Sequence, residues 1–496
     1  MRKLLDPTRF WLRLTLAGAV LAAFETWQIA RPSLWADEVA TIAAANRSLG
    51  QTLHLLYTID AVHGTYYLLI HFIGGVFGYS PLVLRLPSAL AVAGTAIVVA
   101  LIAKRISGER LAWFALILTA ILPRLMWAAT EARSYGIDAF LTALMVWLFL
   151  NVIEDVANPN CTAKRKHLDW VAYTFVVVLD THFFIYSILV AGSQGLWLLW
   201  DRRQIFKHWL LSLGIAVVTS GFLICWVLIE QGQVGWLPQL SQTTLEEIFV
   251  GQAFWENQTL AFIANGLIIA VLAGAVHPRS QQVLAKQQVP TSYLRLLGII
   301  VLFPPALILL YSLLRNPIYD SRYFTMTAPM VSLLLAIAAD RLFSRRLAVI
   351  AVVLIATLAL PTYFKFRATD AKGTHWESVA VTLNRLEQPG DGVLFTDFDR
   401  KSPSQSRIMI GYRPLVSDLT DLTVVSPYQR ANGLYPKREK VEQEVGKLQA
   451  IKRVLVVQES AERTEYLRVK TVLTNAGFGF ARRVRVAHTW VNIFSK

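Results

Sequence analysis

Two adjacent carboxylates, Asp37 and Glu38, follow Trp35 at the start of a long loop after the first apolar segment of the chain. A carboxylate at a membrane surface can take a proton from a reacting hydroxyl group or bind a cation. Neighbouring side chains on a helix diverge by about 100°, so only one of these two would point into a given cleft. A structural interpretation is equally open, in which the carboxylates stabilise a helix N-terminus and the tryptophan anchors it in the interface.

The same loop carries a second pair of side chains suited to chemistry, Asp60 and His63, ahead of Tyr66 and Tyr67. An isolated aspartate and histidine at this spacing can also form only a local hydrogen-bonded turn. The pair gains interest because it shares a loop with the first two carboxylates.

Arginines and tyrosines stand at the ends of later apolar segments, in Glu131-Ala-Arg133-Ser-Tyr135 and in Arg322-Tyr323. Guanidinium groups hold phosphate oxygens well, so these residues are candidates for binding a phosphate or a sugar. Glu131 and Arg133 can equally form an ion pair that only closes a helical hairpin. Two further candidates lie at comparable segment ends: Arg85 and His182.

The sequence predicts no definite cofactor. None of these clusters has the spacing of a structural zinc site, and two cysteines, Cys161 and Cys225, are too few for a Cys-rich one. One carboxylate can still share a hard cation with a phosphate, so a divalent metal stays open.

The composition indicates that membrane helices position these residues. Of 496 residues, 55% are hydrophobic and 16% are charged, whereas soluble domains are about a quarter charged. Since a span needs about 20 apolar residues, the sequence predicts a polytopic α-helical membrane protein with about eleven spans. The fifth and sixth form a hairpin that breaks at Asp180-Thr181-His182. The apolar runs cover roughly residues 10–30, 82–103, 111–129, 136–153, 168–180, 182–200, 208–229, 259–276, 296–314, 324–340 and 347–365.

The basic residues predict the orientation, because Lys and Arg gather in cytoplasmic loops. With the N-terminus in the cytoplasm, that side holds Arg2, Lys3, Arg9, Lys104, Arg105, Arg110, Lys164, Arg165, Lys166, Arg202, Arg203, Lys207, Arg279, Lys286, Arg295, Arg341, Arg345 and Arg346. The net charge of +15 then faces anionic lipid headgroups rather than nucleic acid. We therefore expect a multi-pass protein of the plasma or inner membrane, with its candidate residues on the extracytoplasmic face.

The last part of the chain has a different pattern. A helix over 375–387, strands over 392–396 and 453–457 and a helix over 461–476 predict a small α/β domain with a mostly parallel sheet. It contains neither a phosphate-binding glycine loop nor a nucleophile motif. The predicted domains are thus a transmembrane catalytic domain over 1–366, with a first outer loop at about 31–80, and an extracytoplasmic domain over 367–496.

The order and shared sidedness of these motifs resemble the GT-C superfamily of membrane glycosyltransferases, in the branch of protein O-mannosyltransferases and lipid A aminoarabinose transferases. The resemblance covers about residues 30–330, the later helix count and the outer C-terminal domain. One departure is His63-Gly64-Thr65, where the family often has two prolines after the histidine. The matching elements are Trp35-Ala-Asp37-Glu38, Asp60-x-x-His63, Arg85-Leu-Pro-Ser-Ala-Leu, Glu131-Ala-Arg133-x-Tyr135, Thr181-His182-Phe and Pro317-x-x-x-x-Arg322-Tyr323.

This resemblance implies a GT-C fold and an inverting transfer of a sugar from a polyprenyl-phosphate donor. Phosphate is a good leaving group, so the step needs a base for the acceptor hydroxyl and cations for the departing phosphate. The resemblance assigns the base to Asp37, with Glu38 as its neighbour. It assigns the phosphate to Arg85, Arg133 and Arg322, supported by Tyr135 and Tyr323. It assigns the acceptor or metal side to Asp60, His63, Glu131 and His182.

Two other classes stay open from the sequence. A lipid or glycan transporter or flippase predicts polar groups at the bilayer midplane, where the spans hold little charge apart from Glu25 and Asp138. A scaffold protein needs no concentration of carboxylates and arginines in the outer loops. The sugar is open, and so is the acceptor, which is a glycan, a lipid or a protein.

Overall fold

The chain forms two compact units. The computed structural model describes residues 7–230, 232, 235–276, 289–397, 405–459 and 463–496. The helical unit consists of Met1–Ile29, Asp60–Tyr66 and Leu84–Arg367, and the mixed unit of Ala30–Ile59, Tyr67–Val83 and Ala368–Lys496. Most of the predicted first outer loop thus belongs with the C-terminal segment. Four of the basic residues used for the orientation, Arg2, Lys3, Arg279 and Lys286, lie outside the described residues.

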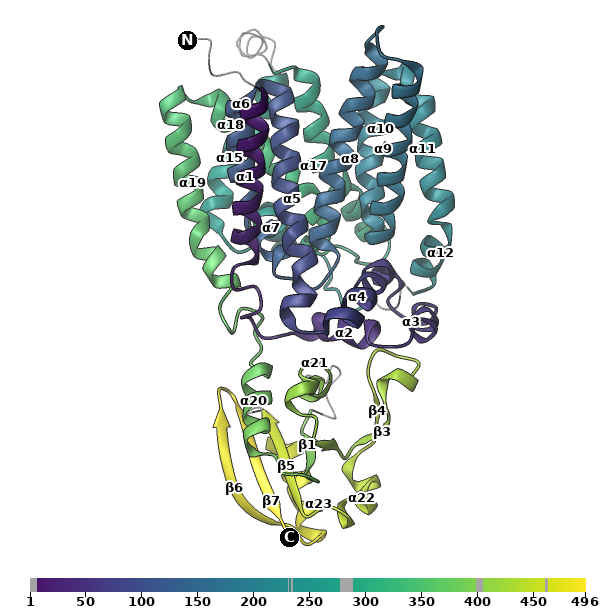
Figure 1. The fold of residues 1–496 in the computed structure, drawn as a ribbon, viewed down its shortest axis with the longest axis vertical. Helices are drawn as coiled ribbons and strands as arrows, with labels where there is room; N and C mark the ends of the chain where they lie inside the picture. Colours follow the sequence, from purple (N-terminus) through teal and green to yellow (C-terminus); the bar gives the residue numbers. More distant parts are fainter. Residues whose placement is uncertain (1–6, 231, 233–234, 277–288, 398–404, 460–462) are drawn as a thin grey trace. The chain divides into compact units, whose positions relative to one another are not determined.

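Every one of the eleven predicted apolar segments is helical in the structure (Figure 1). Among the described residues, five helices are long and apolar enough to cross a membrane, or up to eight if each of three bent pairs counts as one span. The polytopic helical architecture is therefore confirmed, and the number eleven stays a prediction. The helices are α1 (Pro7–Thr26), α5 (Pro81–Ser107), α6 (Glu109–Ala120), α7 (Pro123–Ala129), α8 (Tyr135–Ala157), α9 (Ala163–Phe183), α10 (Ile188–Asp201), α11 (Phe206–Thr219), α12 (Gly221–Ile229), α15 (Gln258–Val276), α17 (Thr291–Leu314), α18 (Ala328–Leu342) and α19 (Arg345–Phe366).

Several spans are broken, and the breaks have local causes. Pro123 begins α7, which bends by 59° from α6 because proline cannot continue the preceding helix. The segment Gln242–Phe254 bends by 86° from the start of α15, at Trp255 with its positive φ of 58°. The predicted break at Asp180-Thr181-His182 is wrong by a few residues: α9 continues to Phe183, and a short 3₁₀ turn, η2 (Ile185–Ser187), leads into α10.

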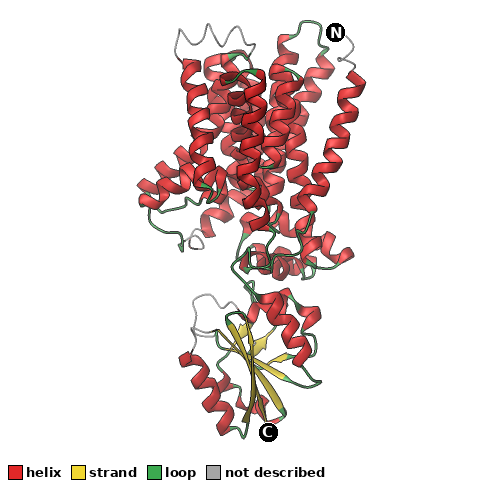
Figure 2. Cartoon of the chain, turned by 90° about the vertical axis from the view of Figure 1, so that its left-hand side faces the viewer, coloured by secondary structure: helices red, strands yellow, loops and turns green. Residues whose placement is uncertain are grey.

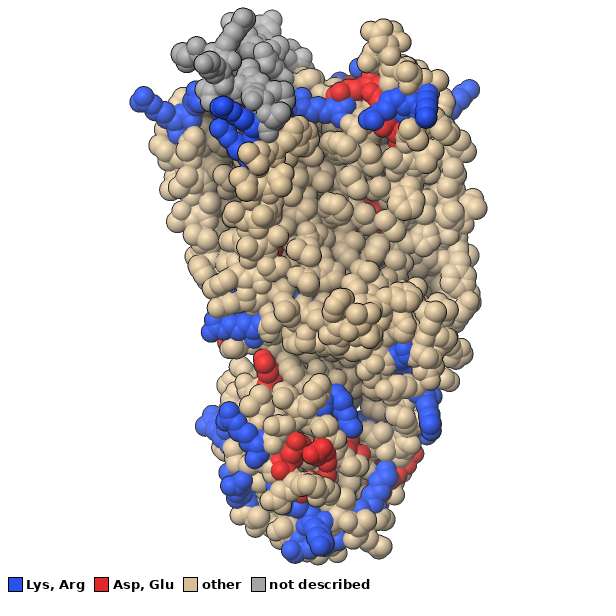
Figure 3. Space-filling view, viewed as in Figure 1, with Lys and Arg blue, Asp and Glu red and all other residues tan. Residues whose placement is uncertain are grey.

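The surface of the helical unit suits a lipid environment. Large apolar side chains are exposed along its helices, including Val20, Val218, Phe262 and Leu313. On the face in Figure 3, Lys and Arg side chains gather at the end nearer the N-terminus, and the side of the helices is almost without charge. These are the features expected of a surface in contact with acyl chains.

Several buried polar groups inside the helical unit contact other polar side chains. Glu25 and Arg367 are 0% and 1% exposed and lie 3.4 Å apart. Asp138 and Asp180 are both fully buried. Thr142 donates to Asp180 at 2.8 Å, and Ser187 donates to Asp138 at 2.9 Å. Each carboxyl group thus has a hydroxyl donor from a neighbouring element, α8 for Asp180 and η2 for Asp138.

The C-terminal part of the mixed unit is an α/β fold whose sheet has the order β2-β1-β5-β7-β6 (Figures 1 and 2). The strands are β1 (Gly392–Phe395), β2 (Thr420–Asp421), β5 (Arg453–Glu459), β6 (Gly479–Val486) and β7 (Thr489–Ser495), with helices α20 (Trp376–Leu386) and α23 (Arg463–Asn475). The two predicted strands and two predicted helices are confirmed. The prediction of a mostly parallel sheet is wrong, because β7 pairs antiparallel with both β5 and β6.

Three helices from the first outer loop contribute to the mixed unit: α2 (Ala36–Ala45), α3 (Leu49–Leu56) and most of α4 (Gly64–Phe77). Arg47 joins them to the C-terminal segment by donating to Ala431 O at 3.2 Å and Gly433 O at 2.7 Å. Its guanidinium also lies 5.6 Å from the ring centre of Tyr428. Burial lowers the pKa of Arg47 and raises the pKa of Tyr428.

Candidate active site

Asp37 and Glu38 both lie in the first turn of α2, after Trp35 as its N-cap residue. Glu38 is fully buried, whereas Asp37 is half-buried. The two side chains thus have the different environments expected of helix neighbours, and Asp37 is the one with access to solvent. Their place at the N-terminus also stabilises the helix, because carboxylates favour the positive end of its dipole.

A second polar group lies within the helical unit around a short 3₁₀ turn, η1 (Ala61–His63). Asp60 precedes this turn with φ 64°, a left-handed conformation that aspartate tolerates better than most residues. Its carboxylate lies 3.7 Å from the guanidinium of Arg133. The ring centres of His63 and Tyr135 are 6.5 Å apart, edge to face. Four of the sequence candidates thus meet in one place.

An aromatic row connects this group to the loop before α18. Phe184 lies 5.7 Å from Tyr135 and 5.9 Å from Tyr323, measured between ring centres. Arg322, next to Tyr323, pairs with Asp320 at 3.0 Å. The row brings two further sequence candidates, Arg322 and Tyr323, to the same side of the helical unit.

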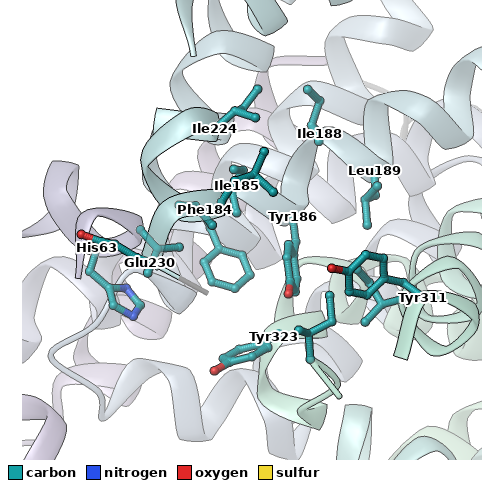
Figure 4. A pocket seen from close by; sticks show the side chains of 15 residues that line it. His63, Phe184, Ile185, Tyr186, Ile188, Leu189, Ile224, Glu230, Tyr311 and Tyr323 are labelled. Carbon is teal, nitrogen blue, oxygen red and sulfur yellow. The ribbon is translucent and has the colours of Figure 1, made fainter. Parts of the chain in front are cut away.

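A cavity of about 380 Å³ lies along this row (Figure 4). Aliphatic side chains from α10, α12 and α17 form most of its wall, among them Leu189 and Ile224. Figure 4 shows His63 and Glu230 together at one side, away from Ile188 and Ile224. The backbone N–H of Ala61 donates to Glu230 at 3.1 Å, which ties the two elements at this side together.

Three polar residues that line the cavity were not among the sequence candidates: Tyr186, Glu230 and Tyr311. Glu230 directly follows an apolar segment that was predicted to end at residue 229, and a carboxylate at that place is a signal of the kind used for Asp37. The two tyrosines lie inside predicted spans, where tyrosine is also an ordinary core residue.

No model of a known protein family matches this sequence, and no curated protein matches it either. Solved structures do match its fold over nearly the whole chain. ArnT from Cupriavidus metallidurans in the apo state superposes with a TM-score of 0.60 at 13% identity, covering 98% of both chains. The chain has the GT-C fold. The resemblance drawn from the sequence motifs is confirmed at this level.

Two further GT-C structures match. ArnT from the same organism bound to undecaprenyl phosphate gives a TM-score of 0.58 at 14% identity, again covering 98% of both chains. The apo oligosaccharyltransferase of Archaeoglobus fulgidus gives 0.50 at 12% identity, covering 97% of this chain and 74% of that one. At such identities a shared fold assigns no residue roles, so the roles are argued from this chain's own geometry.

The other sequence candidates lie elsewhere in the GT-C fold. Arg85 is fully buried and donates to Ile29 O at 2.7 Å, which joins α5 to the end of the α1 segment. Glu131 is also fully buried, in the turn between α7 and α8. His182 contacts Val178 O at 2.8 Å and the hydroxyl of Ser220 at 3.3 Å.

The described residues contain no group of three or more His, Cys, Asp and Glu side chains arranged to hold a metal ion. A cation held by one carboxylate and a substrate phosphate, the arrangement the sequence left open, needs no such group. Carboxylates and arginines are side chains that can transfer a proton and stabilise a developing negative charge.

Proposed function

We propose that this protein is an inverting glycosyltransferase that moves a sugar from a polyprenyl-phosphate carrier to an acceptor at the extracytoplasmic membrane face. The observation that carries the proposal is the apolar cavity in the helical unit with His63, Glu230 and Tyr323 in its wall. Its aliphatic lining suits isoprene units, and the Asp60–Arg133 pair adjoins the turn that carries His63. Undecaprenyl phosphate, which is bound in one of the matching ArnT structures, belongs to this chemical class.

The proposed reaction is a single displacement at the anomeric carbon of the sugar. The bond from this carbon to the phosphate oxygen breaks while the acceptor oxygen bonds from the opposite face, so the configuration inverts. Asp37 takes the proton of the acceptor hydroxyl, and polyprenyl phosphate leaves with the bonding electron pair. Arg133 and Arg322 stabilise the charge that gathers on this phosphate, and Tyr135 and Tyr323 support them.

The remaining candidates have supporting roles in this proposal. Glu38 is buried beside Asp37 and contributes to its environment. Asp60 and His63 shape the polar side of the cavity. Arg85 is a further candidate for holding the phosphate, and Glu131 and His182 are candidates for the acceptor or metal side. A divalent metal, if the reaction uses one, would be held by a carboxylate together with the phosphate.

The proposal places the chemistry outside the cytoplasm of a cell or inner membrane, with the N-terminus inside. The asymmetry of Lys and Arg among the loops supports this orientation. The partners are a polyprenyl-phosphate sugar, membrane lipids and an acceptor that is a glycan, a lipid or a protein.

The test is transfer or hydrolysis by the purified protein in nanodiscs. A panel of polyprenyl-phosphate sugars is incubated with wild type and with Asp37→Asn, and loss of each donor is scored by mass spectrometry. We expect wild type to consume one donor and the variant to be slower by about two to four orders of magnitude, as for loss of a general base. Turnover by the variant above a tenth of wild type would exclude Asp37 as the base. The same purified protein is also reconstituted into vesicles. Movement of the intact donor across the vesicle bilayer would indicate a flippase.

A further inference from the structure

The backbone just before Asp37 is held by side chains that lie far away in the sequence but within the same unit. The N–H of Leu34 donates to the Tyr412 hydroxyl at 2.8 Å, and the Ser33 hydroxyl lies 3.3 Å from the same oxygen. Thr374 donates to Leu34 O at 2.8 Å. Tyr435 donates to Ala36 O at 3.3 Å. Three side chains of the C-terminal segment thus bond to the two residues on either side of Trp35.

These contacts replace a local helix cap. Helices usually begin at a Ser, Thr, Asp or Asn whose side chain accepts from the first turn. Here the N-cap is Trp35, in an extended conformation and without a side-chain cap hydrogen bond. Its carbonyl accepts from Glu38 N at 3.1 Å and Val39 N at 3.0 Å, so the direction of the first turn depends on how residues 34–36 are held.

Close packing fixes the same helix from a second direction. A Cβ atom at Gly411 would lie 2.9 Å from Val39 Cγ2 and 3.3 Å from Leu34 Cδ1. The turn next to Tyr412 therefore lies directly against the first residues of α2. Arg407 places its guanidinium 4.5 Å from the ring centre of Tyr435, which holds this second tyrosine in turn.

We propose that Tyr412 and Tyr435 are positioning residues for Asp37. Their hydroxyl groups fix the first turn of α2, and this fixes the orientation of the Asp37 carboxylate toward the acceptor hydroxyl. The inference rests on the proposed function of Asp37 as the base. It gives the C-terminal segment a part in the chemical step, because a displacement of about 1 Å in a catalytic group can cost about a hundredfold in rate.

Tyr412→Phe tests the inference, since it removes only the hydroxyl. We expect kcat to fall about tenfold with the KM for the sugar donor unchanged. The matched control is Tyr428→Phe, which removes the oxygen that accepts from Asn46 at 3.1 Å beyond the opposite end of α2. The kcat of this control should stay within about twofold of the wild-type value, which is the usual effect of losing a weak surface contact.

A double variant separates positioning from general damage. If Tyr412 acts through Asp37, adding Tyr412→Phe to Asp37→Asn should change the residual rate by less than about twofold. A tenfold loss in both backgrounds, or no loss in the wild-type background, would overturn the inference.

Hydrogen exchange tests the same contact without any turnover. The amides of residues 34–39 should exchange about fivefold faster in Tyr412→Phe than in wild type, as expected for loss of one neutral hydrogen bond. Their exchange rates in Tyr428→Phe should equal those of wild type. Unchanged exchange at Leu34 in Tyr412→Phe would refute the positioning contact. Faster exchange in Tyr412→Phe, combined with no turnover of any sugar donor by wild type, would instead support the contact and refute the proposed function.

Discussion

Arg133→Gln is the variant that best separates binding of the sugar donor from folding. The guanidinium of Arg133 lies 3.7 Å from the Asp60 carboxylate, and these side chains are 6% and 18% exposed. A hydrogen bond from a charged group contributes about 1.5–3 kcal/mol, or roughly 10- to 150-fold in affinity. If Arg133 holds the phosphate, the Kd for a polyprenyl-phosphate sugar should rise by about that factor.

The same substitution also leaves Asp60 without this arginine, at a cost in stability of about 1–3 kcal/mol. Adding Asp60→Asn removes that charge, so the double variant should recover stability but not affinity. Affinity is measured by quantitative native mass spectrometry in nanodiscs and stability by thermal unfolding. The control is Arg315→Gln, because Arg315 is exposed beyond the end of α17. Wild-type affinity in Arg133→Gln, or recovery of both properties in the double variant, would refute the assignment.

The remaining predictions concern the interior of the helical unit, measured by thermal unfolding unless stated. Asp180→Asn should stay within about 1 kcal/mol of wild type, because the amide oxygen can still accept from Thr142, whereas Asp180→Leu removes the acceptor and should cost about 1–3 kcal/mol; equal losses would contradict a role for this hydrogen bond. Arg367→Met breaks the buried ion pair and should cost about 3–5 kcal/mol, so an unchanged midpoint would show that the pair is dispensable. Leu189→Trp narrows the cavity and should weaken binding of the sugar donor at least about tenfold. Leu199 is exposed on the same helix, so Leu199→Trp should leave this affinity unchanged. Equal affinities of the two variants would place the donor elsewhere.

Apolar runs predicted the helices well, since about 20 consecutive apolar residues have few alternatives to a span. Breaks were harder to predict. The α9–α10 hairpin breaks after Phe183, because a polar residue near a helix end can remain in the helix when it has a hydrogen-bond partner, as Asp180 has in Thr142. A sequence shows the polar residue but not its partner.

The C-terminal sheet shows the same limit for strands. The buried strands β1 and β5 appear in the sequence as short apolar runs. Strand β6 was missed because it is largely exposed and carries three arginines, so its pattern does not alternate. Strand β7 was not predicted either, although most of it is buried. Because β7 makes both antiparallel pairings, the two predicted strands alone indicated a mostly parallel sheet.

The candidate site was predictable by residue type but not by grouping. Asp60 and Arg133 were both identified, but their 3.7 Å contact joins segments 73 residues apart (133 − 60). Leu34 and Tyr412 are 378 residues apart, and no local pattern predicts that contact. Motifs on loops show which side chains can react, and long-range packing decides which of them act together.

Photo-crosslinking of a polyprenyl phosphate tests the central claim most directly, namely that the cavity in the helical unit holds the lipid carrier. A diazirine on the isoprene chain, activated in nanodiscs, should label peptides from α10, α12 and α17, and Leu189→Trp should reduce this labelling. Excess unlabelled undecaprenyl phosphate should compete for it. Labelling confined to the outward faces of α1 and α19, insensitive to competitor and to the substitution, would contradict the account.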